Sequence, residues 1–200
     1  LLMLGLGNNL SIVPTLDTAY NNAFCLSGED SSIAFDTNSK MQSLFQNDFT
    51  FSGWFKFTDG KTNPSNNLFG AAVDSNNIVG LTTGKNSSRI TVTYKANGDA
   101  HEQTTTSDAW DDGQLSDFVN VVLVMNRGAV GPGIVTFDLY VNGSAATLGT
   151  ATLTCTKLNA SQFANTSVNV KVGGTNNALG NTEGGLRGDM DEIAFFNKAF

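Results

Sequence analysis

The chain has 200 residues and a formal net charge of -7, from 18 acidic and 11 basic residues. This length suits a single domain that buries roughly 70% of its unfolded surface, so the chain can build a full core. Charged residues make up only 14% of the chain and Lys and Arg form no cluster, which argues against a nucleic-acid-binding groove. The acidic balance favours calcium or neutral glycans over phosphates as ligands. No run reaches the ~18 apolar residues of a membrane-spanning helix, so no membrane insertion is predicted.

The N-terminal end differs from the rest of the chain. Residues 1–6 are apolar, but they are too few for a signal peptide and lack its basic leader. An apolar stretch of this kind is a poor free surface, so we expect residues 1–22 to form an arm that docks on a neighbouring subunit. Residues 23–200 contain no proline-rich linker or repeat and are predicted to form one domain. Position 1 is not Met, which leads us to expect a processed or partial chain.

Short β-rich runs between clusters of Gly, Asn, Ser and Asp follow one another along the chain, and helical periodicity is nearly absent. Residues 49–57 alternate clearly, with Phe side chains on one face and polar residues on the other. Trp54 is expected to pack at the centre of this strand, on a face that the alternation leaves undecided. Strands are predicted over residues 32–35, 49–57, 67–71, 78–81, 89–95, 118–125, 134–141, 147–153, 168–172 and 188–200.

Two of these segments indicate how the strands are arranged. Residues 118–125 form the strongest apolar run and are predicted to be buried on both faces. The dipeptide Asn142-Gly143 follows residues 134–141 and is the strongest short-range signal of a β-hairpin. About ten strands joined by short turns predict an all-β, two-sheet antiparallel sandwich.

The order of six segments makes the fold more specific. They are Leu26–Ile33, Phe49–Lys56, Phe118–Val124, Phe137–Gly143, Val170–Gly174 and Gly188–Phe200. Together they resemble the motifs of laminin-G-like, concanavalin A-like jelly-roll domains, and the resemblance covers roughly residues 24–200. It implies a jelly-roll sandwich with the first and last strands close together. Two positions depart from the family pattern: Ser27 replaces an Asp, which weakens a calcium site at that turn, and Phe118 replaces a Trp, interpreted as a conservative core change.

Relatives of this fold include laminarinase-type glycoside hydrolases, which carry alternate acidic residues on one strand facing the sugar. Asp189 and Asp191 could begin such a pattern, but Ile193 stands where a further Glu would be needed. Alternation would also put Glu192 on the face opposite Asp191. His101 lies in a polar stretch without a neighbouring nucleophile and is interpreted as a surface residue. We therefore predict no catalytic residue and no enzymatic activity.

Acidic residues suggest a calcium site, because Ca²⁺ takes oxygen ligands in flexible geometry. In the resembling fold Glu29 or Asp30 could approach Asp191, so these three residues are the candidate ligands. The alternative is that Asp191 accepts backbone hydrogen bonds and pins the last strand without a metal.

Glycan binding needs an exposed aromatic ring, because the C–H faces of sugars stack on rings. Trp110 lies in a polar loop beside Asp111 and Asp112, and these three residues are the candidate ligand-binding site. The alternative is that Trp110 anchors its loop over the edge of the sandwich.

Laminin-G-like domains of this type occur on phage virion proteins and bacterial adhesins, and this analogy guides the functional hypothesis. We predict a non-enzymatic structural module of the decoration or fibre type, at a virion surface or in the extracellular space, with glycan adhesion. Its partners would be other subunits of the assembly, further copies of itself and cell-surface glycans. The first alternative is a secreted, calcium-assisted carbohydrate-binding domain, and the second is a glycoside hydrolase.

Overall fold

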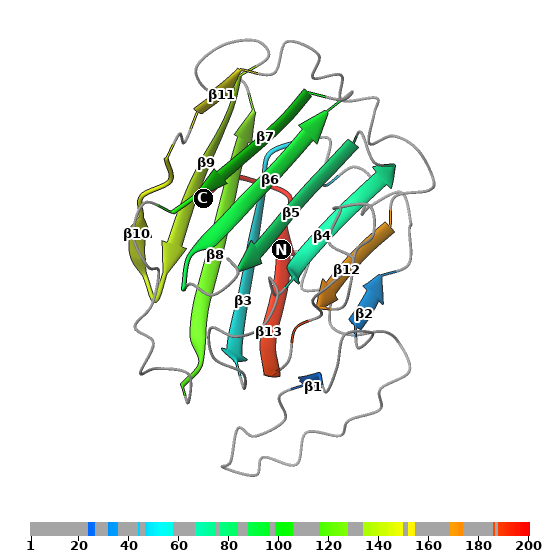
Figure 1. Cartoon of the computed structure of the whole chain (residues 1–200), viewed down its shortest axis with the longest axis vertical. Coiled ribbons are helices and arrows are strands. Elements are labelled where there is room, and N and C mark those ends of the chain that lie inside the picture. Colours follow the sequence, from blue (N-terminus) through cyan, green and yellow to red (C-terminus); the bar gives the residue numbers. More distant parts are fainter. Residues whose placement is uncertain are drawn as a thin grey trace.

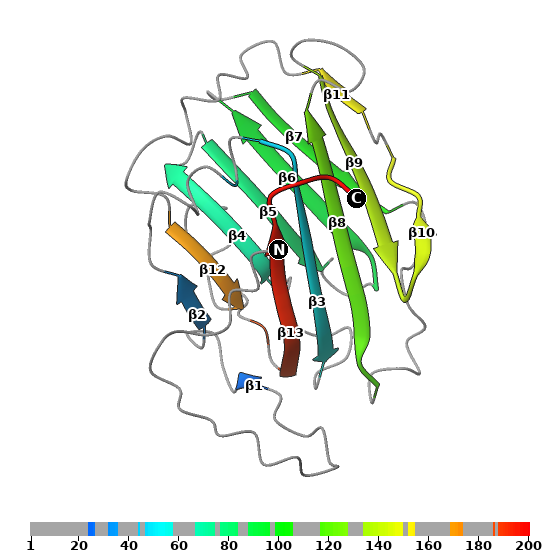
Figure 2. The ribbon, with the colours of Figure 1, turned by 180° about the vertical axis from the view of Figure 1, so that it is seen from behind.

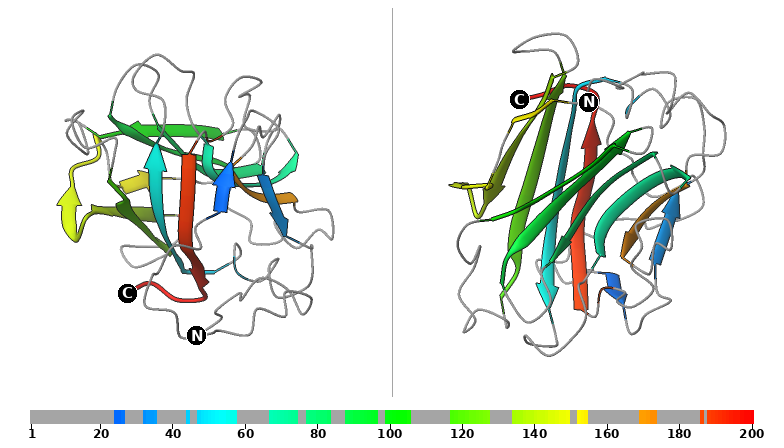
Figure 3. Two further views of the ribbon diagram at one scale, coloured as in Figure 1. Left: turned by 90° about the horizontal axis from the view of Figure 1, so that it is seen from below. Right: turned by 45° about the horizontal axis from the view of Figure 1, so that its top comes forward.

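The computed structural model describes residues 24–26, 32–35, 44, 47–57, 67–74, 77–83, 88–96, 99–105, 117–127, 134–149, 152–154, 169–173, 186 and 188–200. They form two antiparallel sheets that pack face to face (Figures 1 and 3). The predicted jelly-roll sandwich is therefore confirmed. No helix within these ranges has the length and apolar character needed to cross a membrane.

The larger sheet contains both the earliest and the last of the described strands (Figure 2). Its order is β1 (Phe24–Leu26), β13 (Gly188–Phe196), β3 (Phe49–Phe57), β8 (Val119–Arg127), β9 (Ile134–Val141) and β10 (Ser144–Ala146), and β11 (Thr152–Thr154) also pairs with β9. Strands far apart in sequence are thus neighbours, since β13 pairs with both β1 and β3.

The second sheet has six strands. Its order is β2 (Ser32–Phe35), β12 (Asn169–Gly173), β4 (Asn67–Asp74), β5 (Asn77–Thr83), β6 (Ile90–Ala96) and β7 (Asp99–Thr104). Strand β7 was not predicted, because it is polar and lies at the sheet edge, where one side needs no apolar partner. His101 belongs to β7 and pairs with Tyr94; its side chain lies outside the described part of the structure.

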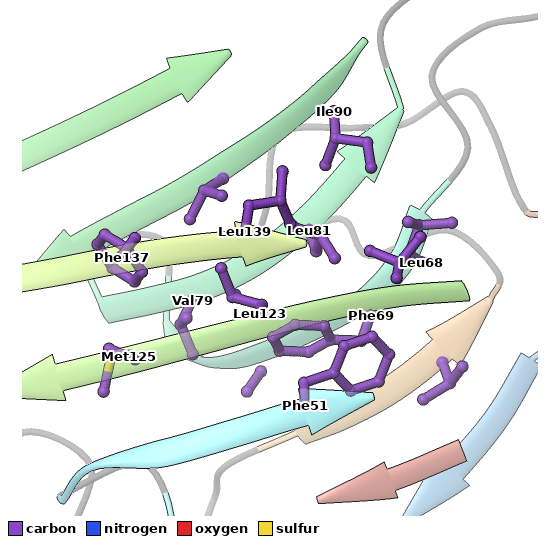
Figure 4. Packing of buried hydrophobic residues seen from close by; sticks show 14 of the residues in the cluster. Phe51, Leu68, Phe69, Val79, Leu81, Ile90, Leu123, Met125, Phe137 and Leu139 are labelled. Carbon is purple, nitrogen blue, oxygen red and sulfur yellow. The ribbon is translucent and has the colours of Figure 1, made fainter. Parts of the chain in front are cut away.

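Aromatic rings from both sheets form the centre of the core. Phe51 of β3 lies 4.5 Å from Phe69 of β4, measured between ring centroids, and 5.1 Å from Phe195 of β13. Phe195 also packs edge-on against Phe69 and Phe35, so this cluster joins four strands. Figure 4 shows Phe51 and Phe69 side by side between the sheets. Rings buried in this way contribute several kcal/mol each, of the order lost in Phe→Ala substitutions (~3–5 kcal/mol).

The alternation predicted for residues 49–57 is confirmed, and it defines two faces of β3. Phe49, Phe51 and Phe55 are buried in the core, whereas Trp54 and Lys56 are half-buried on the outer face of the sheet.

The prediction that residues 118–125 are buried on both faces is wrong for most of the strand. Asn120 and Val122 point to the outer face of the sheet and are half-buried there. Phe118 is 36% exposed, so the interpretation of this residue as a core change is also wrong. Only Val124 is buried on the outer side.

Strand β13 contains a bulge that breaks the expected alternation. Asp191 pairs with Trp54 and Ala194 with Ser52, so two residues of β13 lie opposite Gly53 alone. Glu192 has a φ of 48° and is exposed, while the half-buried Ile193 packs against the core. The regular alternation from which Glu192 was expected on the face opposite Asp191 therefore does not hold at this point of the strand.

Two predicted strands have other bounds in the structure. The segment 147–153 is not one strand, since β10 ends at Ala146 and β11 begins at Thr152. The last strand ends at Phe196, four residues before the end of the sequence, and the remaining residues turn across the sheet (Figure 2).

Candidate functional site

The outer face of the seven-stranded sheet carries a row of polar and aromatic residues. The strand register places Asp191 of β13 opposite Trp54 of β3, and Trp54 opposite Asn120 of β8. The β9–β10 turn follows, where Asn142 N–H donates to the Asn120 carbonyl at 2.9 Å. Four residues from distant parts of the sequence thus form one line across the sheet.

A pocket of about 420 Å³ lies at the β8–β9 part of this row. Its lining combines two aromatic residues with polar groups from the start of β8 and from the hairpin turn. These residues are Trp54, Asp117, Phe118, Val119, Asn120, Asn142 and Gly143. Trp54 is half-buried, and Phe118 is one of two large hydrophobic side chains that are exposed among the described residues. The pocket therefore has two aromatic side chains at the surface of the sheet rather than in the core.

The β9–β10 turn has the conformation that the Asn-Gly dipeptide predicts. Asn142 and Gly143 have φ values of 49° and 76°, as both central residues of a type I′ turn require. The Oδ1 atom of Asn142 accepts the backbone N–H of Asn120 at 2.9 Å, and Asn120 Nδ2 donates to the Gly53 carbonyl at 3.3 Å. These bonds hold both amide side chains in place beside Trp54.

The same bonds leave several polar atoms for a ligand. Among the described residues, Asn120 Oδ1, Asn142 Nδ2 and Trp54 Nε1 have no hydrogen-bond partner. The Asp117 side chain at the pocket rim is exposed and adds carboxylate acceptors. Donors and acceptors therefore line the same pocket as two aromatic residues, which suits a ligand with hydroxyl groups and apolar C–H faces.

Most of the residues predicted from the sequence to bind a ligand or metal lie outside the described ranges. These are Trp110, Asp111 and Asp112 of the glycan site and Glu29 and Asp30 of the calcium site, which stay predictions.

Asp191 is the one candidate that the structure describes. Its Oδ1 atom accepts the backbone N–H of Glu192 at 2.8 Å, so it stabilises the bulge of its own strand. The bond is local and does not join β13 to a neighbouring strand. Within the described residues no group of three His, Cys, Asp or Glu could hold a metal ion.

The sequence does not predict the pocket as a whole, although it contains a signal for two of its parts. The alternation of β3 separates Trp54 from the buried Phe residues, and the Asn142-Gly143 dipeptide predicts the turn. Nothing in the sequence pairs Trp54 with Asn120, because that contact depends on the register between strands 66 positions apart.

A family model described as the concanavalin A-like lectin/glucanases superfamily matches residues 27–200. The chain belongs to this superfamily. The resemblance seen in the sequence motifs is thereby confirmed over residues 27–200, which include every described strand except β1. No relative among curated protein sequences matches the chain.

Solved structures with the same fold include several members with low sequence identity. The CBM40 domain of the Ruminococcus gnavus IT-sialidase, bound to α2,6-sialyllactose, has a TM-score of 0.60 and 14% identity over 89% of this chain and 91% of that one. The K499G mutant of NanB sialidase from Streptococcus pneumoniae has a TM-score of 0.60 and 20% identity over 89% of this chain.

Domains LG4-5 of the mouse laminin α1 chain have a TM-score of 0.54 and 11% identity over 89% of this chain. This chain spans only 26% of the length of the NanB chain and 43% of the length of the laminin fragment. These similarities establish the fold.

Proposed function

We propose that this chain is a non-catalytic carbohydrate-binding module whose ligand stacks on Trp54 and Phe118. The observation that carries the proposal is the pocket of about 420 Å³, in which the half-buried Trp54 and the exposed Phe118 lie beside amide groups held in place by hydrogen bonds. A sugar offers a C–H face to a ring and hydroxyls that both donate and accept. Asn120 Oδ1 and Asn142 Nδ2 supply one acceptor and one donor of this kind.

The acidic residues support binding without catalysis. Glycoside hydrolysis uses two carboxyl groups about 5–10 Å apart that flank the scissile bond. Asp117 is the single carboxylate among the described residues that line the pocket. Asp191, in the next strand of the row, is bonded to its own backbone neighbour.

The family and its members support the same proposal by analogy. The CBM40 domain was solved with a bound sialyllactose, and other neighbours are the LG4-5 domains of laminin and the binding domain of a botulinum neurotoxin. We therefore infer binding outside the cell, on an extracellular or virion surface. The decoration or fibre role at a virion is the finer form of this proposal, with assembly subunits, further copies of this chain and cell-surface glycans as partners.

The domain division belongs to the same proposal. Residues 1–22 would be an arm that joins the 23–200 domain to a neighbouring subunit. Deleting residues 1–9 should weaken assembly, measured by native mass spectrometry, without lowering the melting temperature. An unchanged assembly would refute the role of the arm.

A glycan array tests the binding function directly. We expect the wild-type chain to bind and Trp54→Ala to lose binding, because the substitution removes the largest ring face of the pocket. Lys171→Ala is the matched control, since Lys171 is half-buried on the six-stranded sheet and lies outside the pocket. If Trp54→Ala binds like the wild type, the site is wrong.

Two further experiments test the calcium-assisted and the hydrolytic alternatives. Repeating the array in EDTA tests the calcium-assisted form, which predicts that binding is lost without the metal. Incubating the chain with each bound polysaccharide and measuring reducing ends tests hydrolysis. Release that disappears in Asp191→Ala at an unchanged melting temperature would make the protein an enzyme.

A further inference from the structure

The aromatic surface continues beyond the pocket into the next row of the same sheet face. There Ser52 of β3, Val122 of β8 and Tyr140 of β9 lie side by side in register. All three are half-buried on the outer face, and the Tyr140 hydroxyl has no partner among the described residues. Tyr140 lines a second hollow of about 190 Å³, together with the exposed residues Asp138 and Thr147. A second aromatic residue with an available hydroxyl therefore lies next to the proposed site.

The last residues of the sequence limit this open surface on its other side. Thr50 Oγ1 donates to the Lys198 carbonyl at 2.8 Å, and the segment passes over β3 and β8 (Figure 2). Thr50 and Val124 point outward but are only 2% and 4% exposed. The open strip of the sheet face thus runs between the pocket and the C-terminal segment, across the rows of Trp54 and Tyr140.

The spacing of the two aromatic residues sets the length of a ligand that touches both. Trp54 and Tyr140 are two strands and two residues apart in the register. With strands ~4.8 Å apart and a rise of ~3.4 Å per residue, their Cα atoms are separated by roughly 12 Å. One sugar ring cannot bridge this distance, whereas a short oligosaccharide can place one unit on each ring.

Charge on this face selects the kind of oligosaccharide. The carboxylates of Asp117, Asp138 and Asp191 border the strip, and the chain carries a net charge of -7. Of the cations, Lys56 lies directly opposite Asp189, and Lys198 Nζ lies 4.0 Å from the centroid of the Phe200 ring. Carboxylates therefore outnumber ammonium groups on this face, which disfavours sialic acid, uronates and sulphates relative to uncharged sugars.

We propose that the ligand is a neutral oligosaccharide of at least three units that extends from Trp54 across β8 to Tyr140. This inference rests on the proposed carbohydrate-binding function. It adds a second subsite at Tyr140 and specifies that the ligand is uncharged, unlike the sialyllactose bound to the CBM40 neighbour.

Isothermal titration of the full chain with neutral gluco-, manno-, xylo- and galacto-oligosaccharides of two to five units tests the subsite. In the series that binds, we expect the affinity of the wild type to rise with length up to three or four units. Tyr140→Ala should lower the affinity for the tetrasaccharide about tenfold and for the disaccharide less than about twofold. Tyr140→Phe keeps the ring and should stay within about threefold of the wild type. Comparing lactose with α2,6-sialyllactose tests the effect of a negative charge on the ligand, and we expect lactose to bind at least as tightly as sialyllactose.

The outcomes separate the subsite from the binding function itself. This inference would be overturned if Tyr140→Ala lowered the affinity equally for short and long ligands, or for neither. A higher affinity for sialyllactose than for lactose would also overturn it. None of these results would contradict the Trp54 site. An absence of binding to any sugar, or wild-type affinity in Trp54→Ala at every length, would overturn the proposed function and the subsite with it. Circular dichroism of each variant confirms that it folds, as expected for substitutions at half-buried outer positions.

Discussion

The Cδ1 atom of Ile193 lies 2.6 Å from the position that a Cβ atom of residue 53 would occupy, so β13 fits against β3 without a shift only because residue 53 is glycine. The Phe55 ring lies within 3.0 Å of the same position. The bulge of β13 and the missing side chain of β3 are thus two parts of one arrangement. Asp191, the last residue before the bulge, lies opposite Trp54 in the polar and aromatic row of the outer face.

Gly53→Ala should therefore lower the free energy of unfolding by about 1–3 kcal/mol, the usual cost of overpacking a core. Adding Ile193→Val should recover part of this loss, because it removes the Cδ1 atom, although Ile193→Val alone should cost about 0.5–1.5 kcal/mol. Equilibrium urea denaturation of the single and double variants measures both. An unchanged midpoint for Gly53→Ala would show that the strands adjust freely.

Two other glycines should differ sharply in their response to alanine. Gly188 has a φ of 151°, and a Cβ atom there would lie 1.8 Å from the Lys56 carbonyl oxygen, so Gly188→Ala should cost more than about 3 kcal/mol. Gly143 has a φ of 76°, but no atom lies within 4 Å of the position that a Cβ atom would occupy there. Gly143→Ala should therefore lower the free energy of unfolding only by the cost of alanine in the left-handed conformation, about 1–2 kcal/mol. Thermal denaturation compares them, and a similar loss in both would contradict the steric argument.

Asn142 combines a structural and a proposed binding role that substitution can separate. Asn142→Gly keeps the backbone with positive φ and removes the bond to Asn120 N–H, so it should cost about 0.5–1.5 kcal/mol. Asn142→Ala should cost about 1–2 kcal/mol more, because alanine disfavours a φ of 49°. Both variants lack Nδ2 and should bind glycan equally weakly by isothermal titration. Glycan affinity that followed stability instead would argue against a direct contact.

Asp191 can be tested as a stabiliser of the bulge or as a calcium ligand. Asp191→Asn keeps an Oδ1 acceptor for Glu192 N–H and should be nearly as stable as the wild type, whereas Asp191→Ala should lose about 1 kcal/mol. Calorimetry with calcium and with EDTA should then give the same melting temperature for the wild type. A rise with calcium that Asp191→Asn removes would restore the metal site.

Much of the fold was readable from local patterns. The alternation of residues 49–57 predicts β3 with its correct bounds, and Asn142-Gly143 predicts the β9–β10 turn. Polar β7 was missed, because an edge strand lacks the apolar pattern that marks a central one.

The site was far less predictable than the fold. The polar loop around Trp110 predicts a ligand site there, and this stays a prediction. The pocket that the structure does describe is lined by Trp54, whose face the alternation leaves undecided, and by Phe118, for which the sequence predicts a core position. Whether an aromatic residue is covered depends on what packs above it, which a single segment does not record.

By itself the sequence determined most of the central strands and the Asn-Gly turn, because period-two alternation and turn chemistry act between residues close along the chain. The order of its motifs indicated the superfamily. Tertiary structure alone decided that Asp191, Trp54, Asn120 and Asn142 form one row, that the bulge turns Ile193 toward the core, and that Phe118 is exposed. Pairing between strands far apart in sequence fixes which side chains meet. A shift of one residue in that register would send every one of them to the opposite face.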